Sequence, residues 1–186
     1  MKNTTVILVH GAFADGSSWG DVIPNLEQEG YDVIAVQNPL TSYADDVATT
    51  RRVIDAQAGS VVLVGHSYGG AVITGAARNA SNVRALVYVA AFAPDNGENL
   101  QALLEKYPSK IGGALVPDAA GFLYIDRSQF KEVFAADVSE RVLSVMSATQ
   151  KPINSQIFGQ VYEAPAWKDI PSWYLRATDD QAINPA

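Results

Sequence analysis

The stretch VVLVGHSYGGAVITGA, residues 61–76, decides the fold. It begins with an apolar, β-branched run at residues 61–64, and a helical pattern covers residues 71–79 after a pair of glycines. Between the two stands GHSYG, residues 65–69, which fits the pattern G-x-S-x-G. A serine on a tight strand-to-helix turn presents its hydroxyl above the sheet, and flanking glycines avoid side-chain clashes. The stretch therefore predicts a nucleophilic Ser67 on such a turn.

Four more apolar runs resemble the one before Ser67. They are almost continuously apolar, which is typical of parallel strands covered on both faces. Helical patterns at residues 19–29, 43–58 and 71–79 separate the first four strands, as in right-handed βαβ units. The sequence predicts an α/β fold with a doubly wound, mostly parallel sheet. The additional strands are expected at residues 4–9, 32–36, 83–89 and 173–177.

The strand and helix rhythm is interrupted after residue 94. Helical patterns follow at residues 101–106, 129–135 and 140–147, with one short strand pattern at 122–125. We interpret this region as a helical cap inserted before the last strand of the sheet. The chain then divides into a core part (residues 1–94), the cap (95–165) and a second core part with the last strand (166–186).

Composition restricts the function. The 186 residues are 48% hydrophobic and carry a formal net charge of -7, which argues against nucleic acid or an anionic membrane as partner. The chain has no cysteine, so disulfides, a thiolate nucleophile and cysteine-ligated zinc are excluded, and we expect no metal or other cofactor. The apolar run at residues 6–9 is too short for a signal peptide. We expect a cytoplasmic protein that acts on small molecules.

The stretch HGAF, residues 10–13, follows the first strand directly. In sites of this kind the oxyanion is bound by two backbone N–H groups, one from the residue after the nucleophile and one from this loop. This assigns the N–H groups of Tyr68 and Ala12, with Phe13 as the alternative to Ala12. The loop can also be read as an ordinary strand-to-helix turn that uses Gly11 and Gly16 for conformational freedom.

Three stretches together carry a resemblance to a known family. VILVHGAF (6–13) with Trp19 behind it, GHSYGG (65–70) and ATDDQAI (177–183) resemble the α/β-hydrolase superfamily, and in particular its small capped methylesterase and hydroxynitrile-lyase-like branch. The resemblance implies a triad in the chain order Ser, Asp, His. It points to Asp180 as the acid, with Asp179 as the alternative, although both can simply form a turn. Such an acid holds an imidazole in the correct tautomer.

The chain contains only two histidines, His10 and His66. His66 precedes Ser67 on a sharp turn, where neighbouring side chains should diverge, and His10 is expected to be a hydrogen-bonded structural residue. In the family the histidine follows the acid, so we expect it beyond residue 186, together with a final helix-strand-helix. We expect weak or absent turnover from this chain alone. The last strand becomes an exposed edge that can pair with the missing segment or with another chain.

The leading hypothesis is a serine hydrolase that cleaves a small carboxylic ester through an acyl-enzyme. A catalytically impaired fragment or ligand-binding homologue is the first alternative. A hydroxynitrile lyase is the second, since the related branch uses the same triad with an added C-terminal lysine. The candidates for the substrate pocket are Phe13, His66, Phe92, Phe122 and Tyr124.

Overall fold

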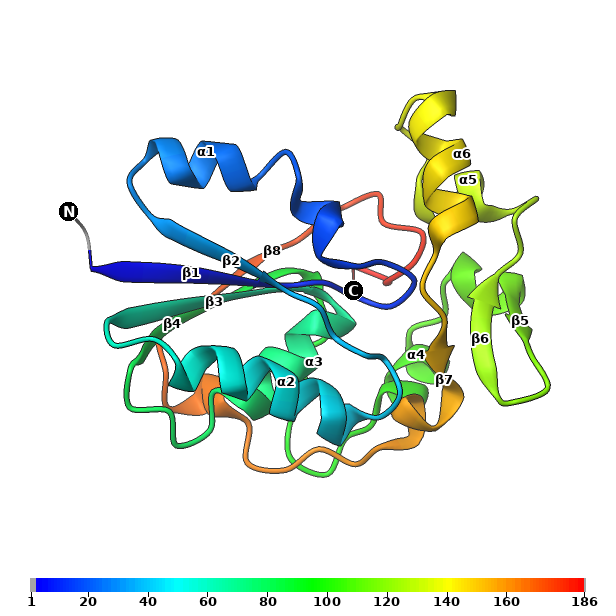
Figure 1. Cartoon of the computed structure of the whole chain (residues 1–186). Helices are drawn as coiled ribbons and strands as arrows, with labels where there is room; N and C mark the ends of the chain where they lie inside the picture. The colour runs from blue at the N-terminus through cyan, green and yellow to red at the C-terminus, as the bar shows by residue number, and fades with distance from the viewer. Residues whose placement is uncertain (1–2, 186) are drawn as a thin grey trace.

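The computed structural model describes residues 3–185. Its main sheet has five parallel strands in the order β2-β1-β3-β4-β8. Helix α1 (Ile23–Gln28) covers one face, whereas α2 (Tyr43–Asp55) and α3 (Tyr68–Ala76) cover the other (Figure 1). The predicted doubly wound fold is confirmed. The strands are β1 (Thr4–Val9), β2 (Asp32–Val36), β3 (Ser60–Ser67), β4 (Val83–Ala91) and β8 (Ser172–Leu175).

Strand β1 shows why the strand patterns are continuously apolar. Ile7 and Val9 belong to the large core on the α2 and α3 side, whereas Leu8 packs with Trp19 on the α1 side. Ile7 and Leu8 are both fully buried although they face opposite layers. Each face of the strand is therefore covered, as the sequence predicts.

The first helical region is shorter than expected. A 3-10 turn, η1 (Gly16–Trp19), precedes α1, which begins only at Ile23. The carboxylate of Asp15 accepts a hydrogen bond from Ser17 N (2.7 Å) and caps this earlier turn. Proline is favoured in the first turn of a helix, and a proline stands there in α1. The region 19–29 thus divides into two short pieces.

The segment between β4 and β8, residues 95–165, lies beyond the carboxyl ends of the strands (Figure 1). Its helices and β6 match the expected pattern, but β5-β6-β7 also form a separate antiparallel sheet. Strands β5 and β7 are too short to show an alternating pattern in the sequence. The elements are α4 (Leu100–Lys106), η2 (Lys110–Ala114), β5 (Leu115–Pro117), β6 (Phe122–Ile125), α5 (Phe130–Phe134), α6 (Glu140–Thr149), β7 (Ile153–Asn154) and η3 (Ser155–Gly159), followed by η4 (Ala166–Lys168).

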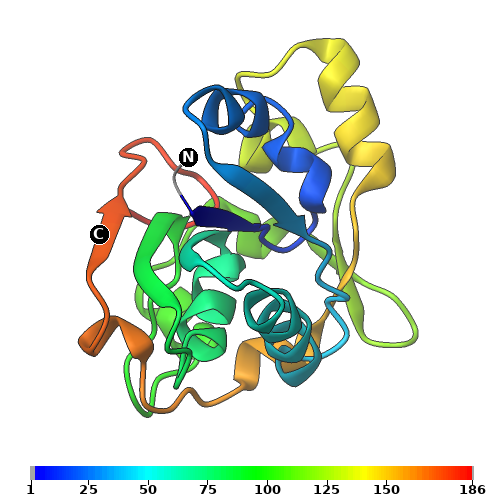
Figure 2. The ribbon, with the colours of Figure 1, turned by 60° about the vertical axis from the view of Figure 1, so that its left-hand side comes forward.

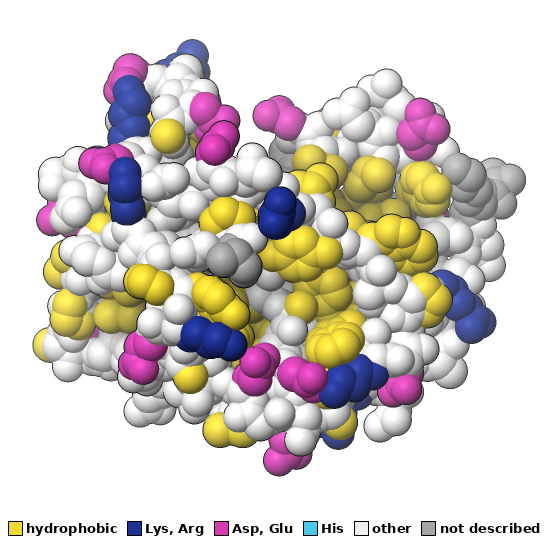
Figure 3. All heavy atoms as spheres, turned by 180° about the vertical axis from the view of Figure 1, so that it is seen from behind, with side chains coloured by type: hydrophobic (Ala, Val, Ile, Leu, Met, Phe, Trp, Pro, Cys, Tyr) yellow, Lys and Arg dark blue, Asp and Glu magenta, His cyan; other side chains and the backbone are white. Residues whose placement is uncertain are grey.

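Strand β8 lies at the edge of the main sheet, beside β4 (Figure 2). Its residues Trp173, Tyr174 and Leu175 remain 60%, 50% and 58% exposed, so this strand is covered much less than the others. Exposed hydrophobic side chains gather on the face turned away in Figure 1 (Figure 3). Within residues 3–185, no helix is long and apolar enough to cross a membrane.

Candidate active site

Ser67 occupies the turn between β3 and α3. Its backbone has φ 54° and ψ −125°, a conformation that costs a non-glycine residue of order 1–3 kcal/mol. The Phe92 N–H donates to the Ser67 carbonyl oxygen (3.1 Å) and ties the turn to the end of β4. Among residues 3–185 the Ser67 hydroxyl has no hydrogen-bond partner. The turn thus holds a strained serine with an unengaged hydroxyl.

Glycines allow two close approaches at this turn. A Cβ atom at Gly69 would lie 2.3 Å from the Val9 carbonyl oxygen, so α3 can begin against β1 only with glycine there. A Cβ atom at Gly11 would lie 2.7 Å from the Ser67 Cβ and 3.1 Å from its Oγ. The loop after β1 therefore passes directly beside the candidate nucleophile.

The candidate oxyanion donors, Ala12 and Tyr68, lie close to Ser67. Ala12 and Tyr68 are buried, and together with Ser67 they line one cavity. In the described part of the chain, the hydrogen bonds of turns, loops and helix caps engage neither backbone N–H. Phe13 is also buried and has φ 63°, an uncommon value for a residue with a side chain. The geometry therefore brings all three candidate residues beside Ser67.

His10 is a structural residue, as expected. Its Nε2 accepts a hydrogen bond from the Asn38 N–H (3.1 Å), so the ring proton lies on Nδ1 and is donated to the Gly11 carbonyl oxygen (2.8 Å). The ring is fully buried, and burial lowers its pKa below the ordinary 6.5. Both nitrogens are occupied in fixing the loop, so neither faces Ser67 as a base.

His66 packs against Trp19. Its ring meets Trp19 edge to face, with 6.3 Å between ring centroids, and makes no hydrogen bond among the described residues. Burial lowers the pKa of His66, and the charge of Asp180 opposes this effect. His66, Trp19, Ser67 and Asp180 line a common cavity of about 820 Å³. No hydrogen bond joins His66 to Ser67.

The two candidate acids follow β8 and reach the same 820 Å³ cavity. The Asp180 Oδ1 accepts hydrogen bonds from the N–H groups of Ala182 (2.8 Å) and Ile183 (3.0 Å), which orders the loop. The Asp179 carbonyl oxygen accepts a hydrogen bond from the Gln181 side chain (2.9 Å). Asp180 is also the carboxylate whose charge opposes the lowering of the His66 pKa.

The side chain of Tyr68 is hydrogen-bonded to a buried carboxylate, that of Asp46. The Tyr68 hydroxyl donates to Asp46 Oδ2 (2.7 Å), and the Leu40 N–H donates to Asp46 Oδ1 (2.8 Å). Asp46 is fully buried, and burial raises its pKa while the bond from Tyr68 lowers it. Sequence reasoning missed this residue because an aspartate in the first turn of a helix is ordinary.

Lys151 connects the segment inserted between β4 and β8, residues 95–165, to residues 10–13, the candidate oxyanion loop. Its backbone N–H donates to the Phe13 carbonyl oxygen (3.4 Å), and its Nζ donates to the Asn38 carbonyl oxygen. Asn38 in turn donates to His10, so one lysine supports two parts of the loop. A lone lysine between α6 and β7 gives no signal in the sequence.

A second, smaller cavity of about 170 Å³ also borders Ser67. The predicted pocket residues Phe13 and Phe92 line this smaller cavity, whereas His66 lines the larger one. Phe122 and Tyr124 line neither, which corrects their assignment to the pocket. They lie on β6, where pairing with β7 and β5 holds them in the small sheet.

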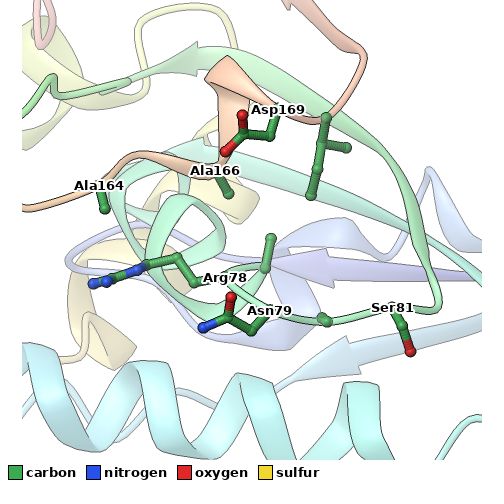
Figure 4. A pocket seen from close by; sticks show the side chains of 9 residues that line it. Arg78, Asn79, Ser81, Ala164, Ala166 and Asp169 are labelled. Carbon is green, nitrogen blue, oxygen red and sulfur yellow. The ribbon is translucent and has the colours of Figure 1, made fainter.

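A further hollow lies at the other end of α3. It measures about 560 Å³ and is lined by residues that include Arg78, Asn79 and Asp169 (Figure 4). Ser67 stands at the start of α3 and this hollow lies just past its end. It contains none of the predicted site residues and is separate from the candidate active site.

The fold and the serine turn together define a class of protein. The family model described as "Alpha/beta hydrolase family" matches residues 6–186, so the chain belongs to this family. Among curated proteins it is similar to a carbendazim hydrolyzing esterase of Nocardioides sp. (strain SG-4G), with 32% identity over 174 residues. This match covers 87% of the chain and 64% of that esterase, so the chain spans less than two thirds of its relative. The alpha/beta hydrolase nvfD of Aspergillus novofumigatus is 25% identical, with 98% of the chain and 80% of that protein covered.

Solved structures agree on the fold. An extracellular α/β-hydrolase from Paenibacillus species superposes with a TM-score of 0.82 at 20% identity, covering 98% of this chain and 81% of that one. Polyneuridine aldehyde esterase gives a TM-score of 0.79 at 18% identity, with coverage of 99% and 83%. These neighbours support the α/β-hydrolase architecture predicted from the sequence.

Proposed function

We propose that this chain carries the nucleophile, the oxyanion donors and the acid of a serine esterase that cleaves small carboxylic esters. The observation that carries the proposal is the contact between the Gly11 loop and Ser67, because it sets backbone N–H groups beside an unengaged hydroxyl. Membership of the α/β-hydrolase family and the similarity to an esterase support the same reaction class.

In the proposed reaction the Ser67 Oγ attacks the ester carbonyl carbon while a base takes its proton. The N–H groups of Ala12 and Tyr68 stabilise the oxyanion, which collapses and expels the alcohol, protonated by the same base. Water then attacks the acyl-enzyme and releases the carboxylic acid and the serine. Asp180, which lines the 820 Å³ cavity together with Ser67, orients the base.

We propose that this base is an imidazole from outside the 186 residues, seated in the 820 Å³ cavity. Neither histidine of the chain is in position to act as this base. Both ring nitrogens of His10 are hydrogen-bonded to backbone groups, and His66 makes no hydrogen bond to Ser67. The cavity borders both Ser67 and Asp180, which are the two groups that such an imidazole must contact.

The test is chemical rescue with free imidazole. Hydrolysis of p-nitrophenyl acetate by the chain should be slow and should rise on adding imidazole, after subtraction of the rate with the Ser67→Ala variant. Asp180→Asn should weaken the rescue, whereas Asp179→Asn is the matched control and should leave it unchanged. Fast hydrolysis without imidazole that disappears in His66→Ala would instead identify His66 as the base.

A ligand-binding homologue is the second candidate, because no base is bonded to Ser67 among residues 3–185. A fluorophosphonate probe separates the two functions. Added with imidazole, it should increase the intact mass of the 19.9 kDa chain by one adduct, located on Ser67. A chain that stays unlabelled would support binding without catalysis.

A further inference from the structure

We infer that the substrate presents one compact, apolar ring of about the size of benzene to the 170 Å³ cavity beside Ser67. This inference rests on the proposed function for the reaction at Ser67, and it adds the class of ester. The reasoning uses three properties of the cavity, namely the chemistry of its walls, its volume and its position.

The walls of this cavity are mostly aromatic and aliphatic, and among residues 3–185 no charged side chain lines it. Phe13 and Phe134 meet edge to face with 6.1 Å between ring centroids, in the range that aromatic pairs prefer. A flat ring placed among such walls can continue the edge-to-face packing. The main wall residues are Phe13, Phe92, Leu104, Ile111, Phe134 and Phe158.

The hydroxyl groups of the wall are already engaged, apart from Ser67. Tyr68 donates its hydroxyl to Asp46, away from the cavity, and the Ser109 hydroxyl donates to the Ala182 carbonyl oxygen (2.7 Å). A polar group of the substrate would lose water here without finding a side-chain partner, which is unfavourable. The bound group is therefore apolar.

The volume sets the size of the group. An engineered apolar cavity of about 150 Å³ binds benzene. The cavity beside Ser67 measures about 170 Å³ and thus accommodates one six-membered ring but not two fused rings. Overfilling a packed interior is destabilising, so a bicyclic group should bind clearly worse.

The position of the cavity connects the ring to the reacting carbonyl. Ala12, Ser67 and Tyr68 all line it, so the ring lies next to the ester group. Ser67 also borders the 820 Å³ cavity, which is large enough to hold the second half of the ester beside the proposed imidazole. The ring can belong to the acid, as in a benzoate ester, or to the alcohol, as in a phenyl ester.

Binding is tested first without catalysis. Calorimetric titration of the Ser67→Ala variant should show saturable binding of toluene and at least about tenfold weaker binding of 1-methylnaphthalene. Phe158→Ala enlarges the cavity and should reverse this order. Phe122→Ala is the matched control from the same segment and should change neither affinity.

Leu104→Ala serves as a second enlarging variant if Phe158→Ala does not fold. Absence of saturable toluene binding, equal affinity for both hydrocarbons, or an order unchanged by enlargement would overturn the inference.

Hydrolysis then identifies the half of the ester that carries the ring. With imidazole present, either phenyl acetate or methyl benzoate should be cleaved faster than its naphthyl counterpart. Toluene binding without hydrolysis of any ester would refute the esterase and leave the one-ring pocket standing. Faster cleavage of both naphthyl esters would refute the one-ring pocket and leave the esterase standing.

Discussion

The Tyr68 hydroxyl is expected to stabilise the serine turn through the buried carboxylate of Asp46. Tyr68→Phe removes a 2.7 Å hydrogen bond and leaves Asp46 Oδ2 buried without its partner. Hydrogen bonds to charged groups contribute about 1.5–3 kcal/mol, whereas neutral pairs contribute about 0.5–1.5 kcal/mol. We therefore expect a loss in unfolding free energy of about 2 kcal/mol at neutral pH.

The loss should depend on pH in a defined direction. Burial raises the pKa of Asp46 above its ordinary 3.8, and the bond from Tyr68 partly opposes this rise. A raised pKa means that the folded state holds the proton more tightly, so ionisation of Asp46 lowers stability as pH increases. Tyr68→Phe raises the pKa further, and its effect should shrink to about 1 kcal/mol once Asp46 is protonated.

Urea denaturation measures this effect at neutral and acidic pH. The matched control is Tyr124→Phe, since the Tyr124 hydroxyl makes no hydrogen bond among residues 3–185. A double-mutant cycle with Asp46→Asn isolates the pair. A loss of equal size at both pH values, or a coupling energy near zero, would refute the role assigned to this hydrogen bond.

Three further predictions concern the loops around Ser67. Gly69→Ala would put a Cβ atom 2.3 Å from the Val9 carbonyl oxygen, so urea denaturation should show a loss of about 3 kcal/mol in the free energy of unfolding. Gly159→Ala is the control, because the space around Gly159 is open, and it should change this free energy by less than about 0.5 kcal/mol. Burial lowers the pKa of His10 below 6.5, so the unfolded chain binds more protons than the folded chain and the free energy of unfolding should fall as pH drops below 6.5. A His10→Gln variant whose unfolding free energy depends on pH as strongly as that of the original chain would contradict this. Lys151→Met should lower the free energy of unfolding by about 1.5 kcal/mol in urea denaturation. It should also raise the pKa of His10 in an NMR titration, because the lysine charge lowers that pKa. An unchanged His10 titration would contradict the proposed contact.

The sequence was sufficient to predict the features that depend on local pattern. The five strands of the sheet follow from continuous apolar runs, and the Ser67 turn follows from its two glycines between a strand and a helix. The hydrogen-bonded, structural role of His10 also follows from its place at the end of β1. These features share one property, which is that neighbouring residues in the chain determine them.

Features that depend on contacts between distant segments could not be predicted. Asp46 lies 22 positions from Tyr68, and its pairing appears only when α2 and α3 are packed together. Lys151 lies 113 positions from Asn38. Phe122 and Tyr124 are aromatic, as pocket residues often are, but strand pairing in the small sheet fixes where they lie. Composition alone cannot distinguish an aromatic wall from an aromatic core.

The inserted segment contacts both loops that flank Ser67. The Lys151 N–H donates to Phe13 in the oxyanion loop, and the Ser109 hydroxyl donates to Ala182 in the loop that follows β8 and carries Asp179 and Asp180, the acid loop. Lys110 N–H adds a second bond to the acid loop at the Gln181 carbonyl oxygen (3.0 Å). Because the 170 Å³ cavity lies among these same three parts, a ring bound there packs against every element that positions the reacting groups. In the proposed reaction, recognition of the ring and the order of the reacting groups depend on one set of contacts, which makes the inserted segment part of the proposed site.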